Sequence, residues 1–437
     1  MKKITILLSC LMLSSITVTA QTSRQEIKAK VTLATNNYQD YPVPTKKLTA
    51  SPRGYEPFYI SHYGRHGSRW LIGKGAFDNP YRTLHTADSL GKLTERGKFV
   101  LEVVKAMRDE GRSRDGELTP LGAQQHRGIA KRMFERFPQV FAGKTHVDAK
   151  STVVIRCILS MENEMQQLMA MNPQIDITHD ASYHDMYYMN DGNSPYDKMV
   201  RTKEAMDSLK AFNSRHADFS HLMTVLFNDP EYAKTLNQGS VATQVFNMAK
   251  DLTNTELRHK YENFWDVFTD DEIYDIWLQS NAYWYTYKGP CSYNGGAGMY
   301  TQLNLVQNIV ETADTCLRLD HPGATMRFGH EVNVLPLVCL LNLNGYGNPR
   351  TDLERLDDEG WYSYNIFPMA CNVQFVFYKP TKKSKANASG NADADILVKV
   401  LLNENEATLP VKTDRAPYYH WKDVRAYLNG LLKRKVI

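Results

Sequence analysis

Two arginines and a histidine form the cluster in this chain that is best suited to chemistry. Residues 58–70 read FYISHYGRHGSRW, where Arg65 and Arg69 flank His66 and a glycine follows the histidine. A guanidinium binds an oxyanion through two hydrogen bonds and stays charged, and an imidazole, whose ordinary pKa is ~6.5, can act as a neutral nucleophile. The spacing predicts a phosphate or carboxylate pocket with His66 as the nucleophile. A solvated basic loop is an equally good interpretation of these residues alone.

A second histidine follows another short apolar segment. Residues 324–329 have the pattern of a strand, His330 and Glu331 come next, and an apolar helix pattern follows. Because ligands of open α/β sheets bind beyond the carboxyl ends of the strands, we expect His66 and His330 to meet there, with Glu331 beside them. The alternative for this segment is an ordinary helix start that contains an acidic residue.

A third arginine is expected near a helix start. Ser151 and Thr152 can cap a helix that runs to about Met171, which places Arg156 in its first turn. Backbone N–H groups and the positive end of the helix dipole lie at the same place, so Arg156 would strengthen an anion site there. Taken alone, an arginine at such a position is more often a surface residue.

Apolar periodicity predicts the elements that position these residues. Strands are expected at residues 58–63, 145–150, 324–329, 371–377 and 396–400. Helices are expected within residues 79–111, from Thr119 onward, at 299–317 and at 421–431. Residues 21–53 contain three prolines and predict an extended lead-in.

The middle of the chain has a different pattern. Residues 176–287 are rich in helical spacing and show no recognisable strand, with one helix expected over 196–212 and a capping box at 269–272. We interpret this segment as a helical cap inserted into an α/β core that comprises residues 21–175 and 288–437. The polar loop at 379–394 is expected to be mobile.

Composition excludes several classes of protein. The chain has 437 residues, of which 42% are hydrophobic, enough for one large or two smaller domains. Its formal net charge of +4 gives no reason to expect nucleic acid or a membrane surface as a partner. We predict no nucleic-acid partner and no membrane span, and the sequence predicts no particular oligomeric state.

The first twenty residues have the three regions of a secretory signal peptide. Lys2 and Lys3 precede an apolar run, and Ala20 ends a cleavage pattern of small residues. We expect cleavage before Gln21 and export to the periplasm or the medium. A lipoprotein cleavage box ending at Cys10 is a less favoured alternative.

Neither the cysteines nor the histidines suggest a metal. Five of the six cysteines would remain after cleavage, and an odd number without short paired spacings argues against a disulfide framework or a zinc site; at most two bridges could form, with their pairing open. His62 and His66 have a spacing seen in metal sites, but on a strand followed by a turn they would not share a helical face. We predict no cofactor and no metal. The cysteines expected to remain after cleavage are Cys157, Cys291, Cys316, Cys339 and Cys371.

Together these motifs resemble those of the histidine phosphatase superfamily, in the branch of histidine acid phosphatases, phytases and multiple inositol polyphosphate phosphatases. The resemblance covers nearly the whole chain after the leader, through residues 65–69, 119–122, 151–160 and 330–331 in that order. It implies a three-layer α/β core with a mixed, mainly parallel sheet similar to that of phosphoglycerate mutases, and an inserted α-helical cap.

The resemblance also implies roles for single residues. His66 would be the nucleophile and Glu331 the proton donor. A phosphate clamp would consist of Arg65, Arg69, Arg156 and His330. Trp70 and Lys74 are interpreted as further substrate contacts.

Three positions depart from the family pattern. Trp70 stands where proline is common, and Lys150 stands where arginine is common. Residues 330–333 read HEVN, which follows the layout of bacterial phytases and glucose-phosphate phosphatases with glutamate in place of aspartate, whereas inositol polyphosphate phosphatases often carry His-Ala-Glu. The carboxyl group of Glu331 would lie one methylene farther out.

We therefore expect an exported phosphomonoesterase that acts through a phosphohistidine on His66, with inositol polyphosphates such as phytate as its substrates. A broad-specificity acid phosphatase or sugar-phosphate phosphatase is the first alternative, and a non-catalytic phosphate-ester binding protein is the second. Because Glu331 must be protonated to donate, and carboxyl groups titrate near ~4, we predict an acidic optimum.

Overall fold

The structure is a computed structural model that describes residues 22–73, 75–190, 194–381 and 396–434. The predicted signal peptide, Lys74 and most of the polar loop at 379–394 lie outside the described residues.

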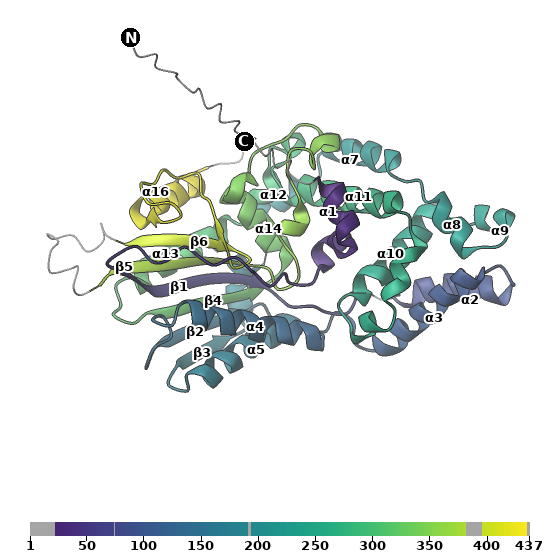
Figure 1. The fold of residues 1–437 in the computed structure, drawn as a ribbon. Coiled ribbons are helices and arrows are strands. Elements are labelled where there is room, and N and C mark those ends of the chain that lie inside the picture. Colours follow the sequence, from purple (N-terminus) through teal and green to yellow (C-terminus); the bar gives the residue numbers. More distant parts are fainter. Residues whose placement is uncertain (1–21, 74, 191–193, 382–395, 435–437) are drawn as a thin grey trace, which may run out of the picture.

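A mixed β-sheet lies at the centre of the fold (Figure 1). The strand order is β3-β2-β4-β1-β5-β6-β7, and β8 pairs with β6. From β3 to β1 the strands run parallel, and β5 and β6 then alternate in direction. The described strands are β1 (Tyr55–Arg65), β2 (His146–Ser151), β3 (Asp176–Asp180), β4 (Gly323–Gly329), β5 (Asn372–Pro380), β6 (Leu397–Leu402), β7 (Asn405–Ala407) and β8 (Tyr419–His420).

Helices cover both faces of this sheet and complete three layers, as predicted. Ile60 packs with α4 (Pro120–Arg136) and α5 (Ile155–Met171), whereas the adjacent Tyr59 packs with the opposite layer, which contains α13 (Leu303–Cys316) and α16 (Trp421–Leu432). Successive side chains of a strand point to opposite faces, so β1 feeds two apolar cores. β4 is buried along its whole length, as expected for a parallel strand covered on both sides.

The remaining helices form a lobe beside the sheet or close one end of it (Figure 1). Their bounds are α2 (Asp78–Ser89), α3 (Glu95–Glu110), α6 (Met186–Met189), α7 (Lys203–Arg215), α8 (Ser220–Leu226), α9 (Pro230–Lys234), α10 (Gln238–Leu252), α11 (Asp270–Lys288), α12 (Ala297–Tyr300) and α14 (Glu331–Leu340). Among the described residues, no helix is both long and apolar enough to cross a membrane.

The boundaries expected for the helical cap need two corrections. Residues 176–180 form β3, which pairs with β2 at the sheet edge, so the prediction of no strand in 176–287 is wrong. α2 and α3, which we had placed in the core, pack against α10 and α8 of the helical lobe. An amphipathic pattern indicates that one face of a helix is buried, but it does not indicate the partner.

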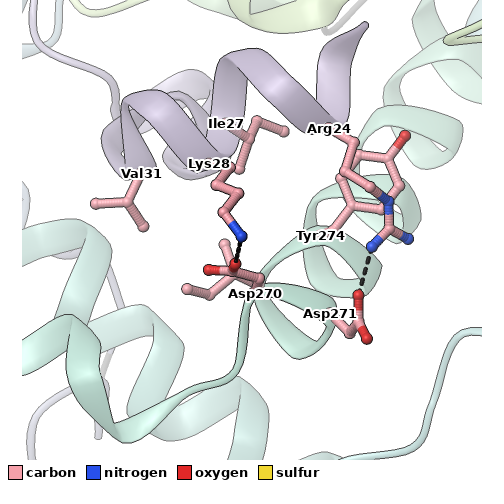
Figure 2. A pocket seen from close by; sticks show the side chains of 8 residues that line it. Arg24, Ile27, Lys28, Val31, Asp270, Asp271 and Tyr274 are labelled. Atoms are coloured by element: carbon pink, nitrogen blue, oxygen red, sulfur yellow. Dashed lines mark hydrogen bonds and ion pairs between the residues drawn. The ribbon is translucent and has the colours of Figure 1, made fainter.

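The lead-in is not extended throughout. Thr22 and Gln25 form a capping box that starts α1 (Ser23–Ala29), and a 3₁₀ segment, η1 (Val31–Tyr38), follows. Figure 2 shows α1 against the start of α11, where Lys28 contacts Asp270 at 2.8 Å and Arg24 pairs with Asp271 beside a small surface pocket. The prolines that suggested an extended chain affect only the residues after η1.

Two expected helices are each interrupted. Residues 195–198 form a 3₁₀ turn and α7 begins after the cap at Thr202, so 196–212 is not one helix. α12 and α13 are separated at Thr301 and Gln302. By contrast, the caps at Thr119 and Gly111, the capping box at 269–272 and the strands predicted along the sheet are confirmed.

Candidate active site

The carboxyl ends of β1 and β4 bring the two histidine segments together. Arg65 is the last residue of β1 and lies opposite Gly329 at the end of β4. The backbone N–H of His66 donates to the carbonyl of Gly329 at 3.0 Å. His66, at the start of its loop, and His330, at the N-cap of α14, therefore lie side by side, and their ring centres are 5.7 Å apart.

The loop after His66 packs backbone to backbone on the start of α4. A Cβ on Gly67 would lie 2.5 Å from the carbonyl oxygen of Gly122, and a Cβ on Gly122 would lie 2.3 Å from that of Ser68. The N–H of Gly67 also donates to the hydroxyl of Ser160 on α5 at 3.1 Å. Only glycine fits at these two contact points, which explains why a glycine follows the histidine and a second one opens the helix.

The environment of His66 fixes which ring nitrogen is reactive. Its Nδ1 lies 2.8 Å from the carbonyl oxygen of Gly67, which can only accept, so Nδ1 carries the proton. Nε2 is left with its lone pair, 3.7 Å from a carboxylate oxygen of Glu331. Burial, followed by the charges of Arg65 and Arg156, holds the pKa of His66 well below its usual value. The ring is therefore neutral and nucleophilic at Nε2.

Arg65 is fully buried and has unused donors. Nη1 donates to the backbone carbonyls of Asn37 and Phe367, the latter at 3.2 Å. Nε lies 3.0 Å from Glu331 without hydrogen-bond geometry, and Nη2 has no hydrogen-bond partner. Buried polar groups in a folded protein usually have a hydrogen-bond partner, so these donors are suited to bind an oxyanion.

Arg69 is held from behind by an aromatic residue that the sequence gave no reason to select. Nη1 donates to the hydroxyl of Tyr38 at 2.8 Å and to the carbonyl of Trp70 at 2.9 Å. The Tyr38 ring centre lies 4.7 Å from the guanidinium carbon, a cation–π distance. Nε of this buried side chain has no hydrogen-bond partner.

Arg156 occupies the second position of α5. The helix begins at Ile155 after Val154, and the expected cap at Ser151 and Thr152 is wrong because Ser151 is still part of β2. Burial lowers the pKa of Arg156, and the nearby charge of Arg69 lowers it further. Its Nε is another buried donor without a hydrogen-bond partner.

His330 and Thr152 close the site at the end of β4. Nε2 of His330 shares a hydrogen bond with the hydroxyl of Thr152 at 3.2 Å, and the thiol of Cys157 lies 3.7 Å from the same nitrogen. Burial lowers the pKa of His330 to about 4, although the charge of Glu331 opposes this shift. His330 is a neutral hydrogen-bonding group in the free protein.

Glu331 is the first residue of α14 and faces the arginines. One carboxylate oxygen lies near Nε of Arg65, and the other accepts from the amide of Asn37 at 3.2 Å. Burial alone would raise the pKa of Glu331, but Arg65, Arg69 and His330 lower it to about 2. The carboxyl group therefore differs from the ordinary one we had assumed, since it is ionised in the free protein even at acidic pH.

Trp70 lies next to the clamp and is buried. The guanidinium carbon of Arg114 is 4.9 Å from its ring centre, and its backbone N–H donates to the carbonyl of Glu117 at 3.1 Å. The structure thus shows Trp70 as a packing partner of the 114–117 turn, and the backbone carbonyl of Trp70 accepts from Arg69. Lys74 lies outside the described residues.

A cation is poorly suited to this cluster. The possible ligand atoms of His66, His330 and Glu331 lie within 4.8 Å of one another. Arg65 and Arg69 face the same space, however, and their charges oppose a positive ion. His62, the other histidine of the metal-like pair, packs against Phe328 at a ring distance of 5.4 Å, and burial lowers its pKa to about 3.

Several positioning residues were missed by sequence reasoning. Gln125 accepts from the N–H of Ser68 at 2.8 Å and donates to its hydroxyl, and that hydroxyl donates to Asn254 at 2.6 Å. The amide of Asn254 in turn donates to the carbonyl of Tyr38 at 2.9 Å. These residues come from α4, the turn after α10 and η1, so no local motif connects them. Of these segments, only α4 was predicted, through its helix start at Thr119.

Comparison with known proteins identifies the family. The model of the histidine phosphatase superfamily, branch 2, matches residues 65–403. The chain belongs to this family. The matched region contains every residue of the cluster described above apart from Asn37 and Tyr38, and it makes the protein a histidine phosphatase.

Solved structures that are similar to this histidine phosphatase have the same fold at low sequence identity. A multiple inositol polyphosphate phosphatase of Bifidobacterium longum, in complex with inositol hexasulfate, matches with a TM-score of 0.74 and 17% identity, covering 90% of this chain and 97% of that one. The phytase of D. castellii matches with a TM-score of 0.62 and 13% identity over 92% and 86% of the two chains. The phytase of Citrobacter braakii matches with a TM-score of 0.54, also at 13% identity, over 86% and 98%. No curated protein sequence matches the chain.

Proposed function

We propose that the protein hydrolyses phosphate monoesters through a phosphohistidine formed at Nε2 of His66. The observation that carries this proposal is the tautomer of His66, because the Gly67 carbonyl holds the proton on Nδ1 and leaves the lone pair of Nε2 facing the arginines. A nucleophile between unsatisfied guanidinium donors is the arrangement that phosphoryl transfer requires.

The charges of the arginines and of Glu331 indicate how the site would hold a phosphate group. Arg65, Arg69 and Arg156 carry three positive charges around one ionised carboxylate, Glu331, which leaves an excess that a phosphate ester dianion would neutralise. Their unpartnered nitrogens would donate to the non-bridging oxygens, and His330 would supply a further hydrogen bond. Donors arranged in advance stabilise the charge that develops during transfer.

Glu331 would act as acid and then as base. In the first step a bond forms between Nε2 and phosphorus, the ester P–O bond breaks, and the leaving oxygen takes a proton from Glu331. In the second step water attacks phosphorus, Glu331 takes the water proton, and the N–P bond breaks to release phosphate and free His66.

The low pKa of Glu331 makes its protonation depend on the bound substrate. A phosphate dianion competes for Arg65 and so raises the pKa of the carboxyl group. A substrate monoanion, whose second phosphate pKa is ~6, would also bring a proton into the site. Both routes favour mildly acidic conditions, in line with the predicted acidic optimum.

Inositol polyphosphates such as phytate are the substrates that we propose. Support comes from the excess positive charge of the site and from the similarity in fold to the inositol polyphosphate phosphatase and the phytases. The HEVN layout at residues 330–333 follows that of both bacterial phytases and glucose-phosphate phosphatases, so a broad acid phosphatase or sugar-phosphate phosphatase is the alternative. We also propose export, on the basis of the leader pattern in residues 1–20.

A substrate panel tests the proposal. Phytate, glucose 1-phosphate and p-nitrophenyl phosphate would be compared at pH ~5 with wild-type protein and His66→Ala, with and without a chelator and vanadate. We expect turnover of phytate with the highest kcat/KM, inhibition by vanadate and no effect of the chelator. A preference for glucose 1-phosphate would support the alternative, and activity retained in His66→Ala or lost in chelator would contradict the mechanism.

A further inference from the structure

A lysine on α10 lies beside the clamp without an ion-pair partner. Nζ of Lys250 is 4.5 Å from the ring centre of Tyr38, the same ring that lies against Arg69. Within the described parts of the chain, the ammonium group makes no hydrogen bond and no ion pair. Two cationic side chains thus meet at one aromatic residue at the edge of the site.

The surroundings of Lys250 make an unpaired cation costly. The side chain is partly buried, and burial together with the charge of Arg69 lowers the pKa of Lys250 to about 8. Asp251 is the nearest carboxyl group along the chain, but burial raises its pKa to about 7, so it neutralises little charge. A half-buried ammonium group in this setting is best satisfied by an external anion.

Hydrogen bonds fix the place of Lys250 relative to the nucleophile. The amide of Asn254 donates to the carbonyl of Lys250 at 3.1 Å, and its oxygen accepts from Ser68 in the loop that follows His66. The end of α10 is therefore tied directly to the catalytic loop. Through this contact the helical lobe positions one cation next to Arg69.

We propose that Lys250 binds a second anionic group of the substrate, beside the phosphate held by the arginines, and thereby selects polyphosphorylated over monophosphorylated esters. The inference rests on the proposed function, since it specifies how the same site would recognise its substrate class. One phosphate dianion satisfies the excess charge of the arginine clamp, so the charge of Lys250 remains available for a neighbouring phosphate.

A purely structural role is the alternative, in which Lys250 only packs on Tyr38. The chain offers a matched control, because Nζ of Lys260 lies 4.6 Å from the ring centre of Tyr261. Lys260 is exposed, and Tyr261, followed by Glu102, raises its pKa; neither residue belongs to the site. Loss of a cation–π contact alone would affect both lysine variants in the same way.

The experiment compares a polyanion with a single anion. Inhibition constants of myo-inositol hexasulfate and of inorganic phosphate would be measured against p-nitrophenyl phosphate hydrolysis for wild type, Lys250→Met, Lys250→Arg and Lys260→Met. We expect Lys250→Met to raise the ratio of the hexasulfate constant to the phosphate constant about tenfold, or ~1.4 kcal/mol. Lys250→Arg should keep the wild-type ratio, and Lys260→Met should match wild type in every respect.

An unchanged ratio in Lys250→Met, or an equal change in Lys260→Met, would overturn the inference. Lys250→Gln replaces the methionine variant if the melting temperature shows that Lys250→Met does not fold. The result is separate from the proposed function, since a shifted ratio without phytate turnover would retain the anion subsite and reject phytate as the substrate. If no ester is hydrolysed, calorimetric titration with the same two anions gives the ratio directly.

Discussion

The candidate site and the pocket between α1 and α11 both gather charged side chains, but they pair them differently. In the pocket each cation has its own carboxylate, Lys28 with Asp270 and Arg24 with Asp271, and all four side chains are more than half exposed. In the site Arg65, which is 0% exposed, pairs with Glu331, and the charges of Arg69, 3% exposed, and of Arg156 also act on this one carboxylate.

This difference in pairing and exposure distinguishes charged side chains that only stabilise the fold from those that bind a ligand. Exposed pairs cost little to form and contribute ~1 kcal/mol or less, so the pocket in Figure 2 needs no ligand to explain it. Buried guanidinium groups with unused donors reduce the stability of the fold. A protein keeps them where a ligand supplies the negative countercharge. The following changes test this contrast from the largest expected effect to the smallest.

Removing a buried arginine should have the largest effect. Arg65→Ala is expected to lower kcat/KM about 10³-fold or more, because it removes clamp donors that no other side chain replaces. Arg24→Ala, which removes an exposed arginine from the pocket, is the matched control and should stay within about twofold of wild type. Steady-state kinetics with p-nitrophenyl phosphate measures both variants. Similar losses of kcat/KM in the two would contradict the proposed difference between the site and the pocket.

Removing the carboxyl proton of Glu331 should affect poor leaving groups most. Glu331→Gln is expected to lower kcat/KM, which reports the steps up to release of the leaving group, about 10²-fold or more for phytate, because an alkoxide leaving group needs the proton. The loss should be much smaller for p-nitrophenyl phosphate, whose leaving group is stable as an anion. An equal loss for both substrates would show that Glu331 is not the proton donor.

The buried histidines should make the free protein sensitive to acid. Since the pKa of His330 is about 4 in the folded state and ~6.5 in the unfolded state, the unfolded chain binds more protons as the pH falls below ~6.5. This group alone should reduce the free energy of unfolding by about 2 kcal/mol between pH 7 and pH 5. Urea unfolding of wild type and His330→Gln at both pH values measures the difference, and parallel losses in the two proteins would refute it.

Neutralising a charge in the surface pocket should have the smallest effect. Lys28→Ala is expected to change the free energy of unfolding by ~1 kcal/mol or less and to leave kcat/KM unchanged, since its ammonium group and Asp270 are both largely solvated. Thermal unfolding and the same kinetic assay are sufficient. A loss of activity would mean that the docking of α1 transmits to Asn37 and Tyr38, and the two regions would not be independent.

The sequence located the parts of the site that are local in the chain. A buried strand followed by arginine, histidine and glycine, and a second strand followed by histidine and glutamate, predicted which ends of the sheet would meet, and β1 and β4 are neighbours. Apolar periodicity likewise predicted the strands of the core, because the pattern depends only on residues that are close together in the chain.

Other contacts could not be predicted because they depend on packing between distant segments. Tyr38 and Asn254 have ordinary local sequences, yet they hold Arg69 and the loop after His66. The low pKa of Glu331 likewise arises only when Arg65 and Arg69 lie close to it in three dimensions. A pattern reports which side chains are present, while the partner of each depends on the tertiary structure.

Detection of the covalent intermediate tests the central claim most directly. Wild-type protein and Glu331→Gln, which should slow hydrolysis of the intermediate, would be mixed with p-nitrophenyl phosphate, whose leaving group needs no proton, quenched in alkali and analysed by mass spectrometry and ³¹P NMR. We predict an acid-labile phosphate on Nε2 of His66, absent from His66→Ala and more abundant in Glu331→Gln. Burst release of the alcohol without phosphate on the protein, or phosphate on another residue, would contradict the account.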